Sequence, residues 1–450
     1  MKDFTLAEIA KACNGEYVGD ESLKNAKITS VERDSRQVKN GSLFLAINGE
    51  RVDGHDFIEK CFAQGAVCAL CEKAPENATK PCIVVPSTLD AVRKIGRAYR
   101  EKFDIPVIGI SGSVGKTSTK EMLYAVLSQK FKTHKTQGNL NNELGVPLTL
   151  LSMPEDTEAA VIEMGISDFG EMTRLSEMVQ PTICVLTIIG ECHLENLGDR
   201  DGVLKAKTEM FKNARENADF ILNGDDDKLS TVKTVNGKKP VFFGLDAKND
   251  FYAKNIKNSG DGKVLATLCF DNNNIDVEIP AIGTYMVTNA LAAAAAGKLL
   301  GLTDEEIANG VASYKTVGSR ANVINTGKIK IIDDCYNANP TSVRASLDTL
   351  SNLDGRKVAI LGDMKELGSE ELKLHFDTGV YAKSKGIGTV ITVGELAKEL
   401  AKGADGKAFD TIEDAKSEIL KTIKSGDVVL VKASHSMQFE NIVEFLKQNF

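Results

Sequence analysis

Lys116 and Thr117 are the residues whose type and setting most directly suggest chemistry, because they follow an apolar strand and a glycine-rich turn in the segment IPVIGISGSVGKTST. Backbone N–H groups freed by Gly112 and Gly115 can point at phosphate oxygens, the next helix offers its positive N-terminal end, and Lys116 adds a charge. The Thr117 hydroxyl can bind Mg2+. This shortened G-x-x-G-K-T pattern predicts binding of a nucleoside triphosphate.

Two further polar side chains stand at the ends of predicted strands. Glu163 closes the apolar run AAVIEMG, and His193 follows the run TICVLTIIG. Because the carboxyl ends of parallel strands meet at one edge of a sheet, both side chains are expected near the phosphate loop. Glu163 could hold Mg2+ there. The alternatives are a solvated glutamate and a structural histidine.

The segment GVLKAKTEMF predicts the start of an amphipathic helix that brings Lys205 and Lys207 near the same edge. Most lysines in such helices are solvated, and spacing alone assigns neither of them a special role. The polar loop 138–147, GNLNNELGVP, carries amides that could bind a polar substrate or a metal's water. A plain turn is the alternative for this loop.

Length and composition limit the classes of protein. With 450 residues the chain has room for about three domains. Hydrophobic residues make up 42%, and no apolar run approaches the ~20 residues that span a membrane. Without a secretory signal, we expect a cytoplasmic protein.

Charge and cysteine content exclude further classes. A net charge of -8 without a long basic run argues against a nucleic-acid partner. The nine cysteines lack metal-finger spacing and are expected to be buried free thiols.

The predicted elements fall into three blocks. Residues 1–104 mix a helical start with short β-like runs and indicate a small α/β module. From 105 to about 316, apolar strands alternate with helices, which indicates a mostly parallel sheet, followed by a polar β-like patch and an alanine-rich helix over 287–300. Residues 317–450 form a third α/β block, with four apolar strands separated by helical segments.

Together these motifs resemble the Mur ligases, ATP-dependent enzymes that extend the peptide of the bacterial cell-wall precursor on a UDP-sugar. The phosphate loop GSVGKTS, substrate loop GNLNNELGVPLTL, Mg2+ glutamate VIEMG, histidine turn CHLENLG and lysine helix AKTEMF follow in order. The resemblance implies that Lys207 is carried as a carbamate, made from its neutral amine and CO2, which helps to place a second Mg2+. The implied catalytic set is Lys116, Glu163, His193 and Lys207, and the implied metal ligands are Thr117, Glu163, His193 and Lys207.

The resemblance also implies the fold and the ATP site. It implies a small N-terminal α/β UDP-binding domain (1–104), a central P-loop ATPase-like domain with a mostly parallel sheet (105–316) and a C-terminal Rossmann-like α/β domain (317–450). YMVTNALAAAAA resembles the adenine-contacting helix, although Tyr285 replaces a usual histidine and leaves that position open. The implied ATP-binding residues are Gly112, Ser113, Gly115, Lys116, Thr117, Ser118, Asn289, Arg320, Asp334 and Asn337.

The two ends of the chain indicate the branch of the family. Residues 33–57 resemble the domain that binds the UDP-muramoyl-peptide, and GDMKELG (362–368) resembles the branch that adds D-alanyl-D-alanine. That branch implies UDP-N-acetylmuramoyl-tripeptide, D-alanyl-D-alanine and ATP with Mg2+ as ligands, an acyl phosphate intermediate, and a pentapeptide product used in peptidoglycan synthesis. The implied substrate-binding residues are Ser35, Arg36, Asp53, Gly54, His55, Asn139, Asn141, Asn142, Asp363 and Ser434.

One departure and three rival classes stay open. His435 stands where the K-G-S-R motif of the family has its arginine, so it either substitutes for that arginine or the contact is absent. A P-loop GTPase or motor would share the phosphate loop, but the N-K-x-D guanine motif is missing. A folate-type polyglutamate ligase would share the central chemistry but lack the DSR and DGHDF segments. A catalytically silent UDP-sugar-binding protein would not need the intact catalytic set. Nothing suggests an obligate assembly, so we expect a monomer.

Overall fold

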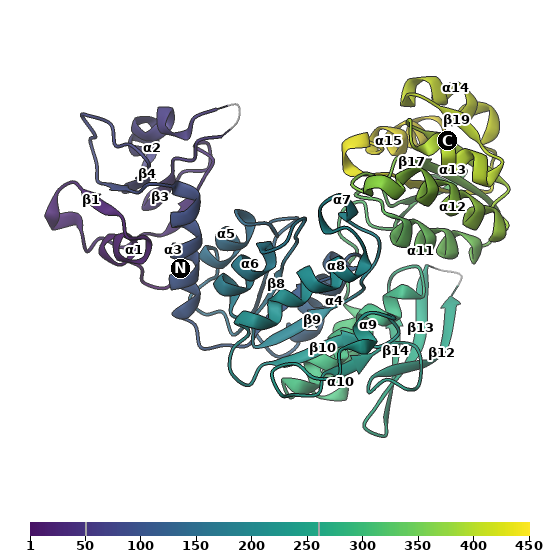
Figure 1. The fold of residues 1–450 in the computed structure, drawn as a ribbon, viewed down its shortest axis with the longest axis horizontal. Coiled ribbons are helices and arrows are strands. Elements are labelled where there is room, and N and C mark those ends of the chain that lie inside the picture. The colour runs from purple at the N-terminus through teal and green to yellow at the C-terminus, as the bar shows by residue number, and fades with distance from the viewer. Residues whose placement is uncertain (50–51, 260–261) are drawn as a thin grey trace.

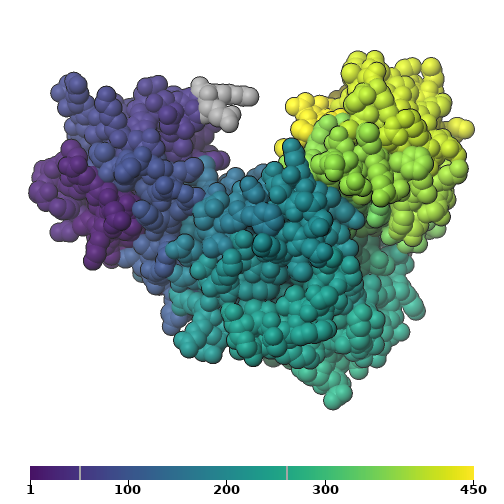
Figure 2. Space-filling view, viewed as in Figure 1, coloured from purple at the N-terminus to yellow at the C-terminus, as the bar shows by residue number. Residues whose placement is uncertain are grey.

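The chain folds into three α/β units, and a computed structural model describes residues 1–49, 52–259 and 262–450. In Figure 1 the N-terminal and C-terminal units stand at opposite ends of the central unit. The space-filling view in Figure 2 shows an open hollow between these two outer units, above the central one. Residues 50 and 51, which belong to the predicted sugar-binding segment 33–57, lie outside the described residues.

The N-terminal unit is a five-stranded sheet with the order β1-β5-β4-β3-β2, parallel except for the β1–β5 pair. A capping box between Thr5 and Glu8 starts the first helix. The last helix, α3, contacts α1 of its own unit and α5 of the central unit. Its buried Arg100 donates to Val179 O of the central unit at 2.9 Å. The bounds are α1 (Leu6–Cys13), β1 (Glu16–Val18), β2 (Ser30–Glu32), β3 (Ser42–Leu45), α2 (Ile58–Gln64), β4 (Cys68–Cys71), β5 (Cys82–Val84) and α3 (Thr88–Glu101).

The central unit is built on a six-stranded sheet with the order β11-β10-β9-β6-β8-β7, in which every pair is parallel, as predicted. Its strands alternate between two apolar faces: Val107 joins one core cluster, and Ile108 and Ile110 join the other. The strands are β6 (Val107–Ser111), β7 (Thr133–Lys135), β8 (Ala159–Glu163), β9 (Ile183–Leu186), β10 (Asp219–Asn223) and β11 (Val241–Phe243). The short polar strand β7, sequence THK, was not predicted.

Helices cover both faces of this sheet. Helices α4, α9 and α10 pack together on one face, while α5, α6 and α8 cover the other. The alanine-rich helix predicted over 287–300 is α9, which begins two residues earlier. The bounds are α4 (Lys116–Leu127), α5 (Gly145–Leu151), α6 (Glu171–Val179), α7 (Leu194–Leu197), α8 (Arg200–Thr208), α9 (Tyr285–Leu299) and α10 (Asp304–Ala312). The predicted polar β-like patch is an antiparallel sheet of β12 (Tyr252–Ser259), β13 (Lys263–Phe270) and β14 (Asn273–Ile279).

The C-terminal unit is a six-stranded sheet with the order β15-β16-β20-β17-β18-β19, antiparallel only between β15 and β16. Two separate apolar clusters line its two faces, so helices lie on both sides. Its strands are β15 (Asn322–Asn325), β16 (Lys330–Asp333), β17 (Arg356–Gly362), β18 (Thr389–Val393), β19 (Lys407–Phe409) and β20 (Asp427–Lys432). Its helices are α11 (Pro340–Ser351), α12 (Glu371–Ser384), α13 (Ala397–Ala404), α14 (Ile412–Thr422) and α15 (Glu440–Asn449).

Three sequence predictions bear on this architecture. The three-domain α/β fold is confirmed, and all nine cysteines are buried and free, as expected. The domain boundaries stay predictions; they fall between α3 and β6 and between α10 and β15. No helix in the described part of the chain is both long and apolar enough to cross a membrane.

Candidate active site

The predicted phosphate loop joins the end of β6 to the start of α4. Gly112 and Gly115 have φ values of 149° and 84°, a region that side chains rarely adopt. A Cβ on Gly112 would also collide with the Thr187 hydroxyl of the neighbouring strand's loop. The Ser113 N–H donates to Ile188 O at 2.8 Å, so the phosphate loop and the loop after β9 are held together.

Lys116 is the first residue of α4, at the positive end of a twelve-residue helix. Its Nζ donates to Gly112 O at 2.8 Å, which folds the side chain back over the phosphate loop. Burial lowers the pKa of the Lys116 amine, and the nearby Glu163 carboxylate opposes that shift. The Lys116 amine therefore lies over the glycine-rich loop and at the N-terminal end of α4, the setting in which a phosphate is bound.

Glu163 lies beside the phosphate loop at the end of β8, as predicted from the strand order. Its carboxylate accepts from the Thr117 hydroxyl at 3.0 Å and from Asn141 Nδ2 at 2.8 Å. A carboxylate next to a hydroxyl and an amide is an oxygen-rich donor set that fits Mg2+, which usually takes one or two carboxylates plus phosphates and water. Among the described residues no group of three or more His, Cys, Asp and Glu side chains could hold a metal alone.

Lys120 is a buried cation that the sequence reasoning missed. Its side chain has no exposed area, and Nζ lies 3.5 Å from Glu163 Oε2 and 3.2 Å from Glu121 Oε1. Nζ also donates to Gly138 O at 3.3 Å, which ties α4 to the predicted substrate loop. The available signal was the spacing: Lys120 follows Lys116 by four residues and so shares its helix face.

Lys207 and Lys205 behave differently although they are two residues apart on α8. Lys207 is 1% exposed, whereas Lys205 is exposed and lies over the Phe169 ring. Within the described ranges no hydrogen bond or ion pair of Lys207 Nζ occurs. Burial, with a smaller contribution from the charge of Lys116, lowers the pKa of the Lys207 amine to about 8. A buried, unpartnered amine that loses its proton near neutral pH fits the predicted carbamate chemistry.

His193 lies at the start of α7 and faces the C-terminal unit. Its Nδ1 is 2.5 Å from Glu366 Oε2, a close contact that lacks the alignment of a hydrogen bond. This contact with the imidazole lowers the pKa of the Glu366 carboxyl. Nearby, the Thr341 hydroxyl donates to Glu191 Oε2 at 2.5 Å, again across the two units. The predicted metal ligand His193 thus engages a residue, Glu366, that sequence spacing did not single out.

Comparison with known proteins identifies the family. Sequence models described as "Mur ligase family, catalytic domain", "Mur ligase middle domain" and "Mur ligase, glutamate ligase domain" match residues 27–100, 110–297 and 319–435. The chain is 36% identical to UDP-N-acetylmuramoyl-tripeptide--D-alanyl-D-alanine ligase of Bacillus subtilis, over 98% of both chains. The chain belongs to the Mur ligase family.

Other relatives agree with this assignment. The enzyme of the same name from Escherichia coli is 34% identical, and the alignment covers 100% of this Mur ligase and 99% of that protein. A crystal structure of MurF from Acinetobacter baumannii superposes with a TM-score of 0.92 at 32% identity, covering 100% and 99% of the two chains. MurF ligase from Thermotoga maritima, solved with ADP, gives 0.85 at 30% identity and covers 93% and 97%. In agreement with these relatives, the chain is an ATP-dependent ligase.

The residues implied to contact the nucleotide lie on both sides of the junction between the central and C-terminal units. Asn289 accepts from the Thr119 hydroxyl of α4 at 2.9 Å, and the Arg320 guanidinium lies 3.9 Å from the centre of the Tyr336 ring. Asp334 pairs with Lys432 at 2.7 Å. Lys432, the last residue of β20, also donates from Nζ to Asn337 O at 2.9 Å and so connects the predicted nucleotide-closing loop to this strand.

His435, which replaces the arginine usual in the family, stacks on the same Tyr336 ring with 5.5 Å between ring centres. Of the two substrate-binding residues implied in the C-terminal unit, Ser434 directly precedes His435 and Asp363 directly follows β17. Ser434 Oγ accepts from Lys365 N at 3.0 Å, and Asp363 pairs with Lys365 Nζ at 2.8 Å. Asp363 and Ser434 are both nearly fully buried, at 2% and 4% exposure, so their side chains already have protein partners.

The residues predicted to face the nucleotide-sugar lie in two turns of the N-terminal unit. Arg36 is exposed and pairs with Asp34 at 2.7 Å, next to Ser35. Asp53 accepts from His55 Nδ1 at 2.6 Å, and His55 Nε2 accepts from Glu72 N at 2.9 Å. These bonds link the turn that carries His55 to the end of β4.

Three further predicted substrate residues have local structural surroundings. Gly54 N–H donates to Ile47 O at 2.9 Å, and a Cβ on Gly54 would lie 2.7 Å from Ile47 N. Asn142 Oδ1 accepts from Gly145 N at 2.8 Å at the start of α5. Asn139 is exposed in the same loop.

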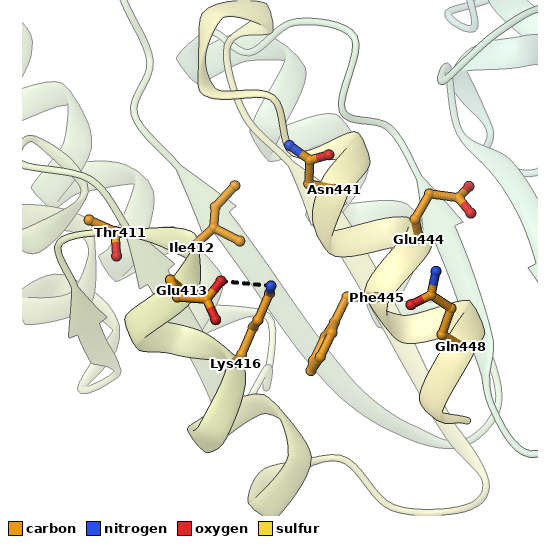
Figure 3. Close-up of a pocket in the computed structure, with 8 residues that line it drawn as sticks. All are labelled: Thr411, Ile412, Glu413, Lys416, Asn441, Glu444, Phe445 and Gln448. Atoms are coloured by element: carbon orange, nitrogen blue, oxygen red, sulfur yellow. Dashed lines mark hydrogen bonds and ion pairs between the residues drawn. The ribbon is translucent and has the colours of Figure 1, made fainter.

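A surface hollow of about 560 Å³ lies elsewhere, between α14 and α15. Figure 3 shows it lined by Phe445 and by charged side chains such as Lys416, which pairs with Glu413 at 2.7 Å. None of the predicted site residues lines this hollow. The candidate active site is therefore the edge of the central sheet that carries the phosphate loop.

Proposed function

We propose that this chain joins D-alanyl-D-alanine to the peptide carboxylate of UDP-N-acetylmuramoyl-tripeptide, with ATP converted to ADP and phosphate. The observation that carries the proposal is the convergence of the phosphate loop, Glu163 and the buried Lys207 at one edge of the central sheet. The relatives named for that reaction match this chain from end to end, which supports the choice of substrates.

The reaction requires activation, because a carboxylate is a poor electrophile. A carboxylate oxygen of the tripeptide attacks the γ-phosphorus of ATP, the bond to the bridging oxygen breaks, and ADP leaves. The amine of D-alanyl-D-alanine then attacks the acyl carbon, loses its proton, and expels phosphate. Lys116 and the N–H groups of the phosphate loop stabilise the negative charge on the phosphoryl group as it is transferred.

Glu163 and Thr117 would hold a Mg2+ ion beside the phosphates, and a carbamate on Lys207, together with His193, would hold a second. When bound, Mg2+ supplies positive charge that neutralises the phosphate oxygens. The carbamate forms when the neutral amine of Lys207 attacks CO2, and the released proton leaves to solvent. Asn141 orients the Glu163 carboxylate through its amide, and Lys120 Nζ lies 3.5 Å from the same carboxylate.

The three units divide the work of bringing the substrates together. We assign the UDP-sugar to residues 1–104, ATP to 105–316 and D-alanyl-D-alanine to 317–450. The hollow between the outer units in Figure 2 supports closure around the substrates, which excludes water from the reactive acyl phosphate. Since a single chain supplies every group named, we propose that it works as a monomer, in the cytoplasm where ATP is available.

The test is a product analysis with a panel of amines. The protein is incubated with Mg-ATP, UDP-muramoyl-tripeptide and either D-alanyl-D-alanine, D-alanine or L-glutamate, and products are weighed by mass spectrometry. We expect the pentapeptide with the dipeptide, and little product with either single amino acid. Efficient ligation of a single amino acid, with D-alanyl-D-alanine inert, would place the chain in another branch of the family.

A further inference from the structure

The turn after β10 contains a buried carboxylate that the reaction scheme does not use. Asp226 is 8% exposed, and its Oδ1 accepts from the N–H groups of Lys228 and Leu229 at 3.0 and 2.8 Å. These two bonds cap the local turn. Its other oxygen, Oδ2, accepts from Ile189 N at 2.9 Å. This third bond leaves the turn and reaches the loop after β9.

Arg200 completes the hold on the same residue. It is the first residue of α8, and its Nε donates to Ile189 O at 2.8 Å. One of its terminal nitrogens lies 3.9 Å from Asp226 Oδ2. Asp226 thus binds the N–H of Ile189 and Arg200 binds its C=O, and these two side chains form one ion pair. Because the N–H and the C=O of Ile189 each have a hydrogen-bond partner, this arrangement holds the backbone of the loop in place.

Ile189 lies between residues that contact the phosphate loop. Ser113 N donates to Ile188 O at 2.8 Å, and Gly190 N donates to Ser113 Oγ at 3.0 Å. The Thr187 hydroxyl donates to Val114 O at 2.5 Å. The same loop leads to His193, and Arg200 opens the helix that carries Lys207. One ion pair therefore links the phosphate loop, the histidine turn and the lysine helix.

We propose that Asp226, through Arg200 and Ile189, is a positioning residue for ligation, which deepens and rests on the function proposed above. It holds the loop after β9 so that Ser113 and His193 keep their places relative to Lys207. This role is distinct from capping of the turn, because the capping hydrogen bonds use only Oδ1, whereas the contact with Ile189 uses Oδ2. Loss of the Oδ2 contact should therefore impair the chemical step while the turn itself persists.

Asp226→Asn is the sharpest test because it keeps the shape of the side chain. The amide oxygen can still cap Lys228 and Leu229, but the amide nitrogen then faces Ile189 N–H, donor against donor. We expect kcat to fall about 10- to 100-fold, since small displacements of reacting groups have effects of that size. The KM for the UDP-tripeptide should stay within about twofold, because its UDP-sugar is assigned to the N-terminal unit, which the substitution does not alter.

The matched control is Asp227→Asn, which removes the same charge one residue later. Asp227 is largely exposed, pairs with Arg200 and has no hydrogen bond with Ile189. Asp227→Asn keeps the Asp226 bond to Ile189 N and the Arg200 Nε bond to Ile189 O, and an exposed ion pair contributes little, so the kcat of this variant should stay close to that of the wild type. Hydrogen exchange measured by mass spectrometry on peptides covering 187–193 should be faster in Asp226→Asn and unchanged in Asp227→Asn.

If Asp226→Asn does not fold, Arg200→Lys serves instead, since it removes the Nε donor to Ile189 O from a partly exposed position. Equal kcat and equal exchange in the two aspartate variants would overturn the positioning role. Inactivity of the wild type and of Asp227→Asn together would instead count against the proposed function. A drop in kcat and faster exchange confined to Asp226→Asn would support the inference.

Discussion

Replacement of Lys207 by alanine should abolish ligation, and the structure gives the reason in numbers. Its pKa of about 8, against an ordinary value of 10.5, leaves about a quarter of the amines neutral at pH 7.5, compared with about one in a thousand for an ordinary lysine. The form that reacts with CO2 is thus enriched roughly 200-fold. Loss of one group that stabilises transition-state charge typically lowers kcat by about 10²- to 10³-fold, and we expect at least that loss.

The assay follows phosphate release with and without added short carboxylic acids such as acetate. A carboxylate that enters the space left by Lys207→Ala should restore part of the activity, because it replaces the anionic end of the carbamate. Lys207→Arg, which stays cationic, should be inactive and resist rescue. Lys205→Ala is the matched control on the same helix and should keep normal turnover. Near-normal kcat in Lys207→Ala would refute the carbamate role, and an equal loss in Lys205→Ala would point to damage of the helix instead.

Two further predictions concern the phosphate loop and the C-terminal unit. Gly112→Ala should lose nucleotide binding, measured with a fluorescent ADP analogue, because a Cβ collides with Thr187; Gly388→Ala, where a Cβ meets nothing within 4 Å, should bind normally. His375 is buried and accepts from Met364 N at 2.9 Å, and burial lowers its pKa below the ordinary 6.5. Its neutral form is favoured in the folded state, so its contribution to stability is present above pH 6.5 and is lost as pH falls, when the unfolded chain takes up the proton. The Tm of the wild type should therefore fall more steeply between pH 7.5 and 5.5 than that of His375→Gln; parallel profiles would refute this reasoning.

Much of the fold could be predicted because the length and spacing of the apolar runs indicate its strands and helices. The strands ending at Ser111 and Glu163 are five-residue buried segments whose side chains are all apolar except at the functional end. The strand Thr133–Lys135 could not be predicted in this way, because its three polar residues form an edge strand whose pairing depends on its neighbour β8.

The candidate site was predicted where chemistry follows directly from strand order. Glu163 meets Thr117 because two parallel strands end side by side. Lys120, Asp226 and Glu366 make their contacts with residues far away in the sequence. These contacts depend on the tertiary arrangement of loops around the sheet edge, which the spacing of residues along the chain does not indicate. The burial that distinguishes Lys207 from Lys205 is also a tertiary property, since both lie on one short helix.

The most direct measurement of the central claim is the fate of oxygen during turnover. The tripeptide substrate is labelled with 18O in its terminal carboxylate and incubated with Mg-ATP and D-alanyl-D-alanine. If the carboxylate attacks the γ-phosphorus, the released inorganic phosphate must carry 18O from the peptide. We predict labelled phosphate together with the pentapeptide and ADP. Amide formation with unlabelled phosphate would contradict activation through an acyl phosphate.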